Sequence, residues 1–233
     1  MLAVRGLDAH YGRAQVLNDV GFEVAEGEAT VLIGRNGAGK SSTMKALIGL
    51  LRPSAGSIRF MGNEIAGGEP HRIARLGLGY VPEERRIFTE LTVMENLSVG
   101  RQPARAGLPA WTPERLFALF PNLGEMRTRP GGRMSGGEQQ MLTVARTLMG
   151  NPRLILLDEP SEGLSPLIVE QMADALAALK RDGMTILLAE QNPHFAKRVA
   201  DHAAVIEKGW VVWTGTIAAL LGDAQVRDRY LAV

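Results

Sequence analysis

The sequence contains no cysteine, which excludes disulfide bonds, thiolate metal sites and cysteine nucleophiles and fits a reducing compartment. It also lacks any window near the roughly 20 apolar residues that would span a bilayer, and its N-terminus shows no basic-then-apolar secretory pattern. Neither sign of charge is in excess, because 26 Lys and Arg residues are scattered among 25 Asp and Glu residues. Without a basic footprint we expect no nucleic-acid partner. If this protein acts at a membrane, we expect it to do so as a peripheral subunit.

What is present is the composition of an ordinary globular protein, with 233 residues of which 45% are hydrophobic and 22% are charged. No long linker, low-complexity tract or internal repeat divides the chain, so we predict a single domain over residues 1–233. The chain ends at "DRYLAV", and we expect no appended regulatory domain.

Apolar runs alternate with helical patterns along much of the chain. Short runs at 29–34, 154–158 and 184–190 predict strands, and helical spacing follows the first two over 38–51 and 166–183. Continuous apolar strands separated by helices are typical of a mostly parallel sheet buried on both faces. The predicted fold class is therefore α/β.

Two other segments predict antiparallel pairing. The first 62 residues contain short strand patterns joined by tight Gly and Asn turns, which indicates a small antiparallel sheet beside the core. Near the C-terminus, two apolar runs flank Lys208 and Gly209, which predicts a hairpin that turns at these two residues.

Residues 86–146 lack strand patterns. They carry helix-start signals instead, namely a capping box of Thr92 with Glu95 and the pair Thr112 and Pro113. We therefore predict an inserted helical subdomain in this segment. The core and its antiparallel sheet would then comprise residues 1–85 and 147–233.

The segment "GRNGAGKS", residues 34–41, matches the phosphate-loop pattern G-x-x-x-x-G-K-[ST] at every constrained position, between a predicted strand and a predicted helix. Its glycines let backbone N–H groups point at phosphate oxygens, and the following helix adds the positive end of its dipole. Lys40 would bind the β- and γ-phosphates, and Ser41 would ligate Mg²⁺. The alternative is a glycine-rich turn whose lysine is solvated. The residues that we expect to contact the nucleotide here are Gly34, Arg35, Asn36, Gly37, Ala38, Gly39, Lys40, Ser41 and Ser42.

Two adjacent carboxylates end the apolar run "LILLDEP", residues 154–160. Burying an ionised carboxylate is costly unless a positive charge compensates it. The phosphate loop supplies that charge, because parallel strands end at the same edge of a sheet. We expect Asp158 to face the Mg²⁺ and Glu159 to orient or deprotonate the attacking water. Taken alone, the pair would also suit a solvated helix start.

The segment "MSGGEQQ", residues 134–140, resembles the LSGGQ-type signature of the ATP-binding cassette (ABC) ATPases, with Met134 in place of the usual leucine. Ser135 and Glu138 also form a capping box, and the two glycines would let a helix N-terminus approach an anion. An ordinary capped helix is the alternative. The resemblance implies an enzyme that hydrolyses ATP, with two ATPs sandwiched in a head-to-tail dimer. The residues that would serve the second subunit's ATP are Ser135, Gly136, Gly137 and Glu138.

This resemblance covers the whole chain and extends to further positions. Tyr11 matches the aromatic residue that stacks on adenine, although a half-buried tyrosine at a strand end would look the same. The segment "SEGLSP", residues 161–166, matches the D-loop that links the two ATP sites, with Ser165 where many members have aspartate. Gln191 stands at the position of the switch histidine, and Glu83 stands at that of the Q-loop glutamine.

The last two departures affect the expected hydrolysis rate more than nucleotide binding. Gln191 would act with Glu159 and Lys40 in catalysis and can hydrogen-bond the γ-phosphate, but its amide cannot carry a proton as histidine can. Glu83 would bring another oxygen ligand, and another negative charge, to the Mg²⁺ held by Ser41 and Asp158. A regulatory subunit that binds ATP and hydrolyses it weakly is therefore an alternative.

The segments "VPEERRIF", "AEQN" and "SEGLSP" together resemble the branched-chain amino-acid uptake ATPases of the LivF type. This resemblance implies an importer motor at the cytoplasmic face of the inner membrane, with two transmembrane permeases, a second cassette and, indirectly, a solute-binding protein as partners. The second cassette would be a sister ATPase or a second copy of this chain. A permease helix would dock near residues 83–88, where Arg85 and Arg86 could equally be a solvated charge pair.

Other functions stay open on the same residues. Transporters of urea, short amides or another amino acid share nearly the same cassette, because the transported solute touches other subunits. A soluble cassette protein that acts on ribosomes or DNA is a further class, but such proteins usually carry two cassettes or long insertions, and this chain shows neither.

Overall fold

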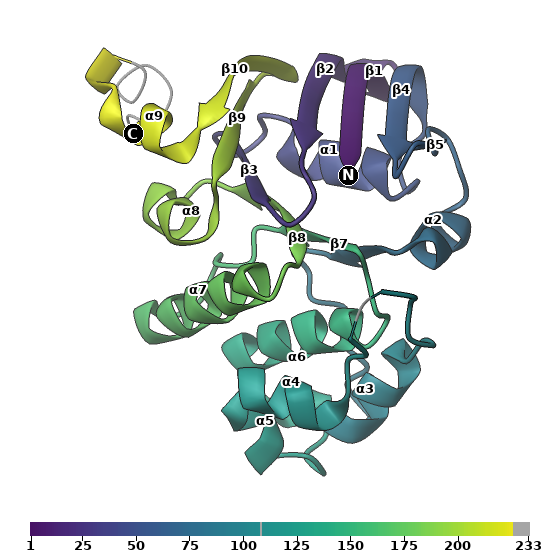
Figure 1. The fold of residues 1–233 in the computed structure, drawn as a ribbon, viewed down its shortest axis with the longest axis vertical. Coiled ribbons are helices and arrows are strands. Elements are labelled where there is room, and N and C mark those ends of the chain that lie inside the picture. Colours follow the sequence, from purple (N-terminus) through teal and green to yellow (C-terminus); the bar gives the residue numbers. More distant parts are fainter. Residues whose placement is uncertain (108, 226–233) are drawn as a thin grey trace.

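A six-stranded sheet at the centre of the fold collects strands from both halves of the chain (Figure 1). This computed structural model describes residues 1–107 and 109–225, so the final segment "DRYLAV" lies outside the described residues. The pairings are parallel except between the last two strands of the chain, which confirms the predicted parallel core. In spatial order the strands are β10 (Trp210–Thr216), β9 (His202–Glu207), β3 (Ala29–Ile33), β8 (Thr185–Glu190), β7 (Leu154–Asp158) and β6 (Leu78–Val81).

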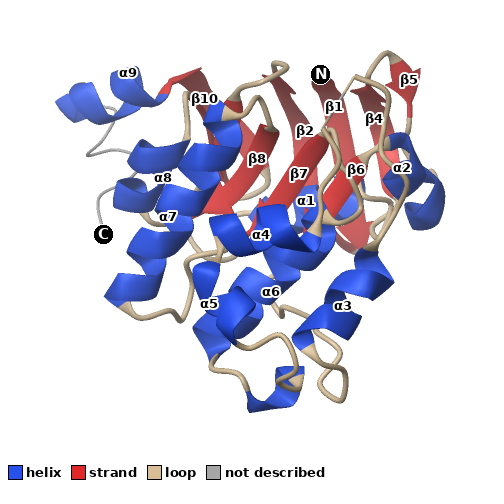
Figure 2. Cartoon of the chain, turned by 60° about the horizontal axis from the view of Figure 1, so that its bottom comes forward, coloured by secondary structure: helices blue, strands red, loops and turns tan. Residues whose placement is uncertain are grey.

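Both faces of this sheet are covered, and alternate residues of each central strand face different sides. In β7, Ile155 and Leu157 pack into a cluster with the helices of one face, whereas Leu154 and Leu156 pack on the other face with α1 (Lys40–Leu47). This two-residue alternation is why the strand is apolar throughout. The helices of the first face are α6 (Gly136–Leu148), α7 (Pro166–Arg181) and α8 (Pro193–Val199) (Figure 2).

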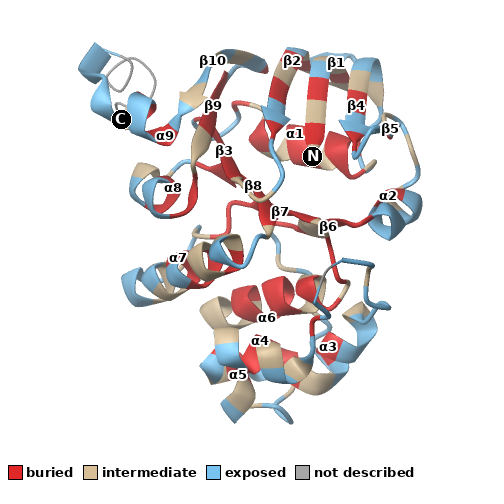
Figure 3. Cartoon of the chain, viewed as in Figure 1, coloured by how far each residue is buried: buried red, intermediate tan, exposed pale blue. Residues whose placement is uncertain are grey.

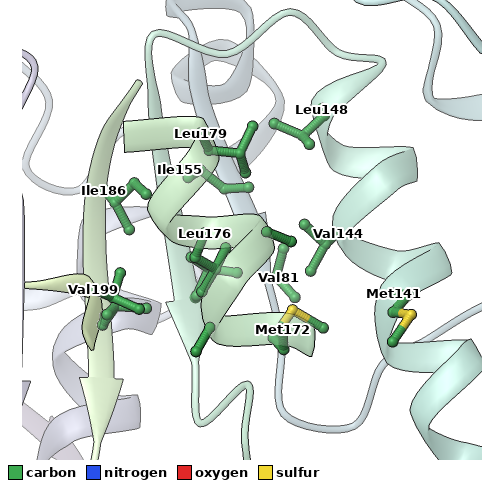
Figure 4. Close-up of a cluster of buried hydrophobic side chains, with 14 of the residues drawn as sticks. Val81, Met141, Val144, Leu148, Ile155, Met172, Leu176, Leu179, Ile186 and Val199 are labelled. Carbon is green, nitrogen blue, oxygen red and sulfur yellow. The ribbon is translucent and has the colours of Figure 1, made fainter. Parts of the chain in front are cut away.

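The cluster under α6 and α7 holds the helices to the sheet. Figure 4 shows Met141, Val144 and Leu148 of α6 pointing toward α7 and the strands, where they meet buried side chains such as Leu176 and Ile155. The apolar face predicted for the helix over 166–183 is therefore correct. That helix ends where Gly183 adopts a positive φ of 86°, which suits glycine.

A second, antiparallel sheet covers α1 on the side away from the central sheet, as the first 62 residues predicted (Figure 1). The buried face of its strands joins α1 in one apolar cluster, whereas the residues of its other face are half-buried or exposed (Figure 3). In spatial order its strands are β2 (Ala14–Val24), β1 (Leu2–Tyr11), β4 (Pro53–Phe60) and β5 (Asn63–Glu64).

The described residues between 86 and 146 form helices and no strand, apart from one isolated bridge. Thr92 accepts a hydrogen bond from the backbone N–H of Glu95 and completes the predicted capping box, and Thr112 caps the helix that begins at Pro113. α6 continues to Leu148, beyond residue 146, so the subdomain boundaries stay predictions. The elements here are α3 (Val93–Gly100), α4 (Pro113–Leu119), α5 (Pro121–Glu125), η1 (Gly131–Arg133) and the start of α6.

Several short elements and one helix boundary differ from those that the sequence predicts. β6 was not predicted because its four residues are too few to show a period. α1 ends at Leu47, although helical spacing continued to Leu51, because the chain turns at Gly49 with a φ of 81°. Outside the predicted helical subdomain, the described helices that were not predicted are α2 (Pro70–Leu76), α8 and α9 (Ile217–Gly222).

The hairpin between β9 and β10 does turn at Lys208 and Gly209, which have φ values of 49° and 83°. Positive values at both central residues match the twist of the flanking strands. Among the residues that the structure describes, no helix is both long and apolar enough to cross a membrane.

Candidate functional site

The parallel strands end together at one edge of the central sheet, which collects residues from distant parts of the sequence. β3 leads into the phosphate loop at Gly34, β7 ends at Asp158, and β8 ends at Glu190. β6 leads through Pro82 to Glu83 at the same edge. In open α/β sheets this edge is where ligands bind.

The phosphate loop, residues 34–41, depends on glycine at positions where a side chain would not fit. A Cβ atom on Gly34 would lie 2.3 Å from the carbonyl oxygen of Ile206, and Gly39 has a φ of 113°. Gly39 also precedes α1, and no side chain caps the helix there. The N-terminal N–H groups of α1 are therefore available to an anion, as the motif predicts.

Lys40 supplies the positive charge that the two carboxylates require. Its ammonium Nζ donates to the carbonyl oxygens of Gly34 at 2.8 Å and Arg35 at 3.0 Å. The same Nζ lies 3.0 Å from Oε1 of Glu159, and the two side chains are only 2% and 6% exposed. The other carboxylate oxygen of Glu159, Oε2, is buried and has no hydrogen-bond partner among the described residues. The fold thus holds Glu159 with one oxygen paired and one free to accept a hydrogen bond.

Asp158 is held by two hydroxyl donors, one on each carboxylate oxygen. Ser41 Oγ donates to Oδ1 at 2.9 Å, and the Tyr80 hydroxyl donates to Oδ2 at 3.1 Å. Burial raises the pKa of Asp158, and the charges of Glu159 and Glu83 raise it further, while the two hydroxyl bonds oppose this shift. A cation beside Asp158 would relieve this penalty.

The few oxygen ligands at this edge suit a Mg²⁺ ion that phosphates and water also hold, rather than a metal ion held by protein ligands alone. Ser41 and Asp158 already contact each other, and Glu83 lies close enough for its charge to affect Asp158. The described residues contain no cluster of three or more His, Cys, Asp or Glu side chains that could hold a metal ion. Mg²⁺ commonly binds through one or two protein oxygens together with phosphates and water.

A cavity of about 520 Å³ opens over the phosphate loop. Tyr11, at the end of β1, is 49% exposed and lies outside this lining, as do the exposed side chains of Glu83 and Gln191. The predicted residues that line the cavity are Gly37, Gly39, Lys40, Ser41, Ser42 and Glu159, together with the unpredicted Gln15, Val16 and Lys208.

Two further acidic residues near the site were not among the predicted site residues. Glu190 is 1% exposed, and its carboxylate accepts backbone N–H bonds from Ser161 at 3.1 Å and from Gln191 at 3.1 Å. It therefore ties the segment after β7 to the end of β8. The adjacent carboxyl group of Glu159 and partial burial raise the pKa of Glu162 to about 7. Glu190 could have been predicted, because it ends a buried strand just as Asp158 does.

The signature residues lie apart from the phosphate loop, because α6 and α1 cover opposite faces of the sheet (Figure 1). The backbone N–H of Ser135 donates to Oε2 of Glu138 at 2.7 Å, and Ser135 Oγ accepts from the N–H of Glu138. Neither residue bonds to Lys40, Ser41 or Asp158. The fold brings Asp158 and Glu159 to the phosphate loop but leaves the signature facing elsewhere.

Comparison with known proteins settles the family. A family model described as ABC transporter matches residues 17–162. The chain belongs to the ABC transporter family. The cassette is 44% identical over 231 residues to the high-affinity branched-chain amino acid transport ATP-binding protein BraG of Pseudomonas aeruginosa, which covers 99% of each chain. Members of this family are ATPases whose activity is coupled to transport, so the predicted family and enzyme class are confirmed.

Other relatives are more distant. The cassette is 34% identical to a probable branched-chain amino acid transport ATP-binding protein, LivF, of Archaeoglobus fulgidus, over 95% of this chain and 94% of that one. It is 33% identical to the lipopolysaccharide export system ATP-binding protein LptB of Haemophilus influenzae, over 99% and 97%. Among solved structures, a nucleotide-free ATP-binding cassette from an ABC transporter superposes with a TM-score of 0.82 at 27% identity, over 97% and 96%. The predicted resemblance to the LivF type and the predicted fold are both confirmed.

Proposed function

We propose that this cassette hydrolyses ATP to drive the uptake of branched-chain amino acids. The observation that supports hydrolysis is the buried pair of Lys40 and Glu159, 3.0 Å apart, beside the cavity over the phosphate loop. The observation that supports the solute is the 44% identity to BraG over nearly the whole of both chains.

The chain's own groups suggest how the reaction proceeds. An incoming phosphate would compete with Glu159 for Lys40 and so release the carboxylate to orient or deprotonate a water molecule. Ser41 and Asp158, with Glu83, would hold Mg²⁺, which supplies charge neutralisation at the phosphates. Gln191 would donate an amide hydrogen bond to the γ-phosphate.

The position of the signature supports a second cassette as partner, and the relationship to transport ATP-binding proteins supports the membrane partners. Ser135, Gly136, Gly137 and Glu138 would bind the ATP of a second cassette, either a sister ATPase or a second copy of this chain. ATP would then favour the closed dimer, because it contacts both halves only in that state. Two transmembrane permeases would dock on the cassette at the cytoplasmic face of the membrane, with a solute-binding protein as an indirect partner.

The large cleft beside β6 is the proposed docking place for a permease helix. This cavity of about 850 Å³ is lined by Arg86 and Phe88 of the predicted docking segment. Phe88 is 46% exposed, and the guanidinium of Arg146 lies 5.1 Å from its ring centroid. Arg86 also pairs with Glu84 at 3.5 Å, so the solvated charge pair is an alternative for this residue.

Replacing Glu159 by Gln tests the motor directly in the complex with its permeases. The substitution keeps the shape of the side chain and removes its charge, so ATP should still bind while turnover falls by about 10²- to 10⁴-fold. Turnover is measured as phosphate release, with nucleotide binding measured in parallel. Equally slow turnover in the parent and in Glu159→Gln would support the regulatory ATP-binding subunit instead.

The solute needs a separate experiment, because BraG and LptB relatives differ in what their names say they transport. The cassette would be tagged and purified from gently solubilised membranes, and its companions identified by mass spectrometry. We expect two permeases and a second cassette to be recovered with the tagged chain. We also expect the complex to take up labelled leucine rather than urea or short amides. Recovery of soluble partners alone would contradict the transport proposal.

A further inference from the structure

Tyr80 joins the metal-site carboxylate to a different part of the molecule. Its hydroxyl donates to Oδ2 of Asp158 at 3.1 Å, across the parallel pairing of β6 with β7. Burial and the charge of Asp158 raise the pKa of Tyr80, so its hydroxyl stays protonated and remains a donor. Because Ser41 holds Oδ1, the two donors together fix the rotation of the carboxylate.

The same tyrosine also forms part of the wall of the 850 Å³ cleft. β6 is the edge strand of the central sheet, and the cleft lies along this edge between α2 and the helical segment. Phe88 and Val99, which are 46% and 53% exposed, line the cleft with Tyr80. One side chain therefore borders this cleft and also bonds to Asp158.

We propose that Tyr80 is a positioning residue that makes the orientation of Asp158, and with it the affinity for Mg²⁺, depend on whether the permease helix occupies the cleft. This inference rests on the proposed function, in which Asp158 serves Mg²⁺. Groups that hydrogen-bond a metal ligand fix its direction, and their loss commonly weakens metal affinity by about 10- to 100-fold. An occupant that presses on the ring would move the hydroxyl without touching the nucleotide.

The hydroxyl is tested with Tyr80→Phe, which keeps the ring. The readout is the Mg²⁺ concentration that gives half of the thermal stabilisation by a non-hydrolysable ATP analogue. We expect this concentration to rise about tenfold, while stabilisation by the analogue in EDTA is unchanged. Thr147→Val is the matched control, since Thr147 also borders the cleft and its hydroxyl bonds to backbone oxygens only. An unchanged Mg²⁺ midpoint in Tyr80→Phe would overturn the proposal.

The same experiment distinguishes a failure of the proposed function from a failure of the proposed role of Tyr80. If the analogue stabilises the parent protein neither with Mg²⁺ nor in EDTA, nucleotide binding itself is refuted. If it stabilises the parent protein and Mg²⁺ has the same midpoint in parent and Tyr80→Phe, only the role of Tyr80 is refuted.

The link between the cleft and the Mg²⁺ affinity is tested by attaching a bulky label in the cleft. Because the sequence contains no cysteine, a maleimide label reacts only at an introduced cysteine. Val99→Cys would carry a bulky maleimide in the cleft, and Val212→Cys, on β10, would carry the same label elsewhere. We expect the label at residue 99 to shift the Mg²⁺ midpoint about threefold or more when Tyr80 is present and not in the Tyr80→Phe background. No shift, or an equal shift in both backgrounds, would overturn the link.

Discussion

The phosphate loop and the signature segment differ in how the polar and charged side chains around a helix N-terminus are paired. Both place a helix N-terminus where an anion can bind. At the phosphate loop, the fold brings Lys40 of α1 together with Asp158 and Glu159 at the end of β7 and pairs the charges within the chain. At the signature, Ser135 and Glu138 bond to each other, and no side chain of the phosphate loop reaches them.

This difference indicates which parts of an ATP site a single chain can bring together by itself. The first region has cation, carboxylates and hydroxyls in contact, so its geometry is set by intrachain packing. The second region has a capped helix with exposed Ser135 at its end. A second cassette would therefore be needed to supply what the signature binds.

The largest expected effect comes from breaking the buried pair with Lys40→Ala. Glu159 would stay buried without its cation, and we expect the free energy of unfolding to fall by about 3–5 kcal/mol. ATP binding should be lost as well. Denaturant unfolding and nucleotide binding measure the two effects.

The double variant Lys40→Ala with Glu159→Gln serves as the control. Neutralising the carboxylate removes the unpaired charge, so most of the lost stability should return while ATP binding does not. If the double variant is as unstable as Lys40→Ala, the ion pair is not the cause of the instability.

A smaller effect is expected from a charge at the signature. Ser135→Asp keeps a good helix cap but places a negative charge where the partner's phosphate would lie. We expect unchanged thermal stability and ATPase activity lower by roughly 10- to 100-fold. Ser135→Asn caps the helix equally well without a charge and should lose less activity. Parent-like ATPase activity in Ser135→Asp would argue that the segment is only a capped helix.

The smallest effect concerns Glu162, next to the phosphate-loop site. Its folded-state pKa of about 7 lies above its ordinary value of 4.5, so its contribution to stability is complete below 4.5 and is lost as the pH rises to about 7. Glu162→Gln keeps the shape of the side chain and does not titrate. The melting temperature of the variant relative to the parent should therefore rise between pH 5 and pH 8. Parallel curves over this range would contradict the assignment.

The sequence predicted best those features that depend on short, local patterns. The phosphate loop and both capping boxes were found because their residues lie within a few positions of each other. The end of β7 was placed correctly because an apolar run followed by carboxylates needs a cation, and one motif offered it. The family resemblance added the signature, whose local pattern alone suggests a capped helix.

Contacts across the sheet could not be predicted in this way. The bond from Tyr80 to Asp158 joins residues 78 positions apart and depends on the pairing of β6, which is too short to recognise. The raised pKa of Glu162 depends on where the segment after β7 turns, since Glu159 has a φ of 48°. The first follows from tertiary packing, whereas the second depends on a turn in which the backbone N–H of Glu162 donates to the carbonyl oxygen of Glu159 at 3.1 Å.

The signature of one chain should complete the ATP site of another. Mixing Lys40→Ala chains with Ser135→Asp chains tests it most directly, because a mixed dimer has one site with an intact phosphate loop facing an intact signature. Each variant alone should be nearly inactive, and an equal mixture of homodimer-forming chains should regain about a quarter of the parent ATPase activity by random pairing. A mixture no more active than the two variants measured separately would contradict the claim.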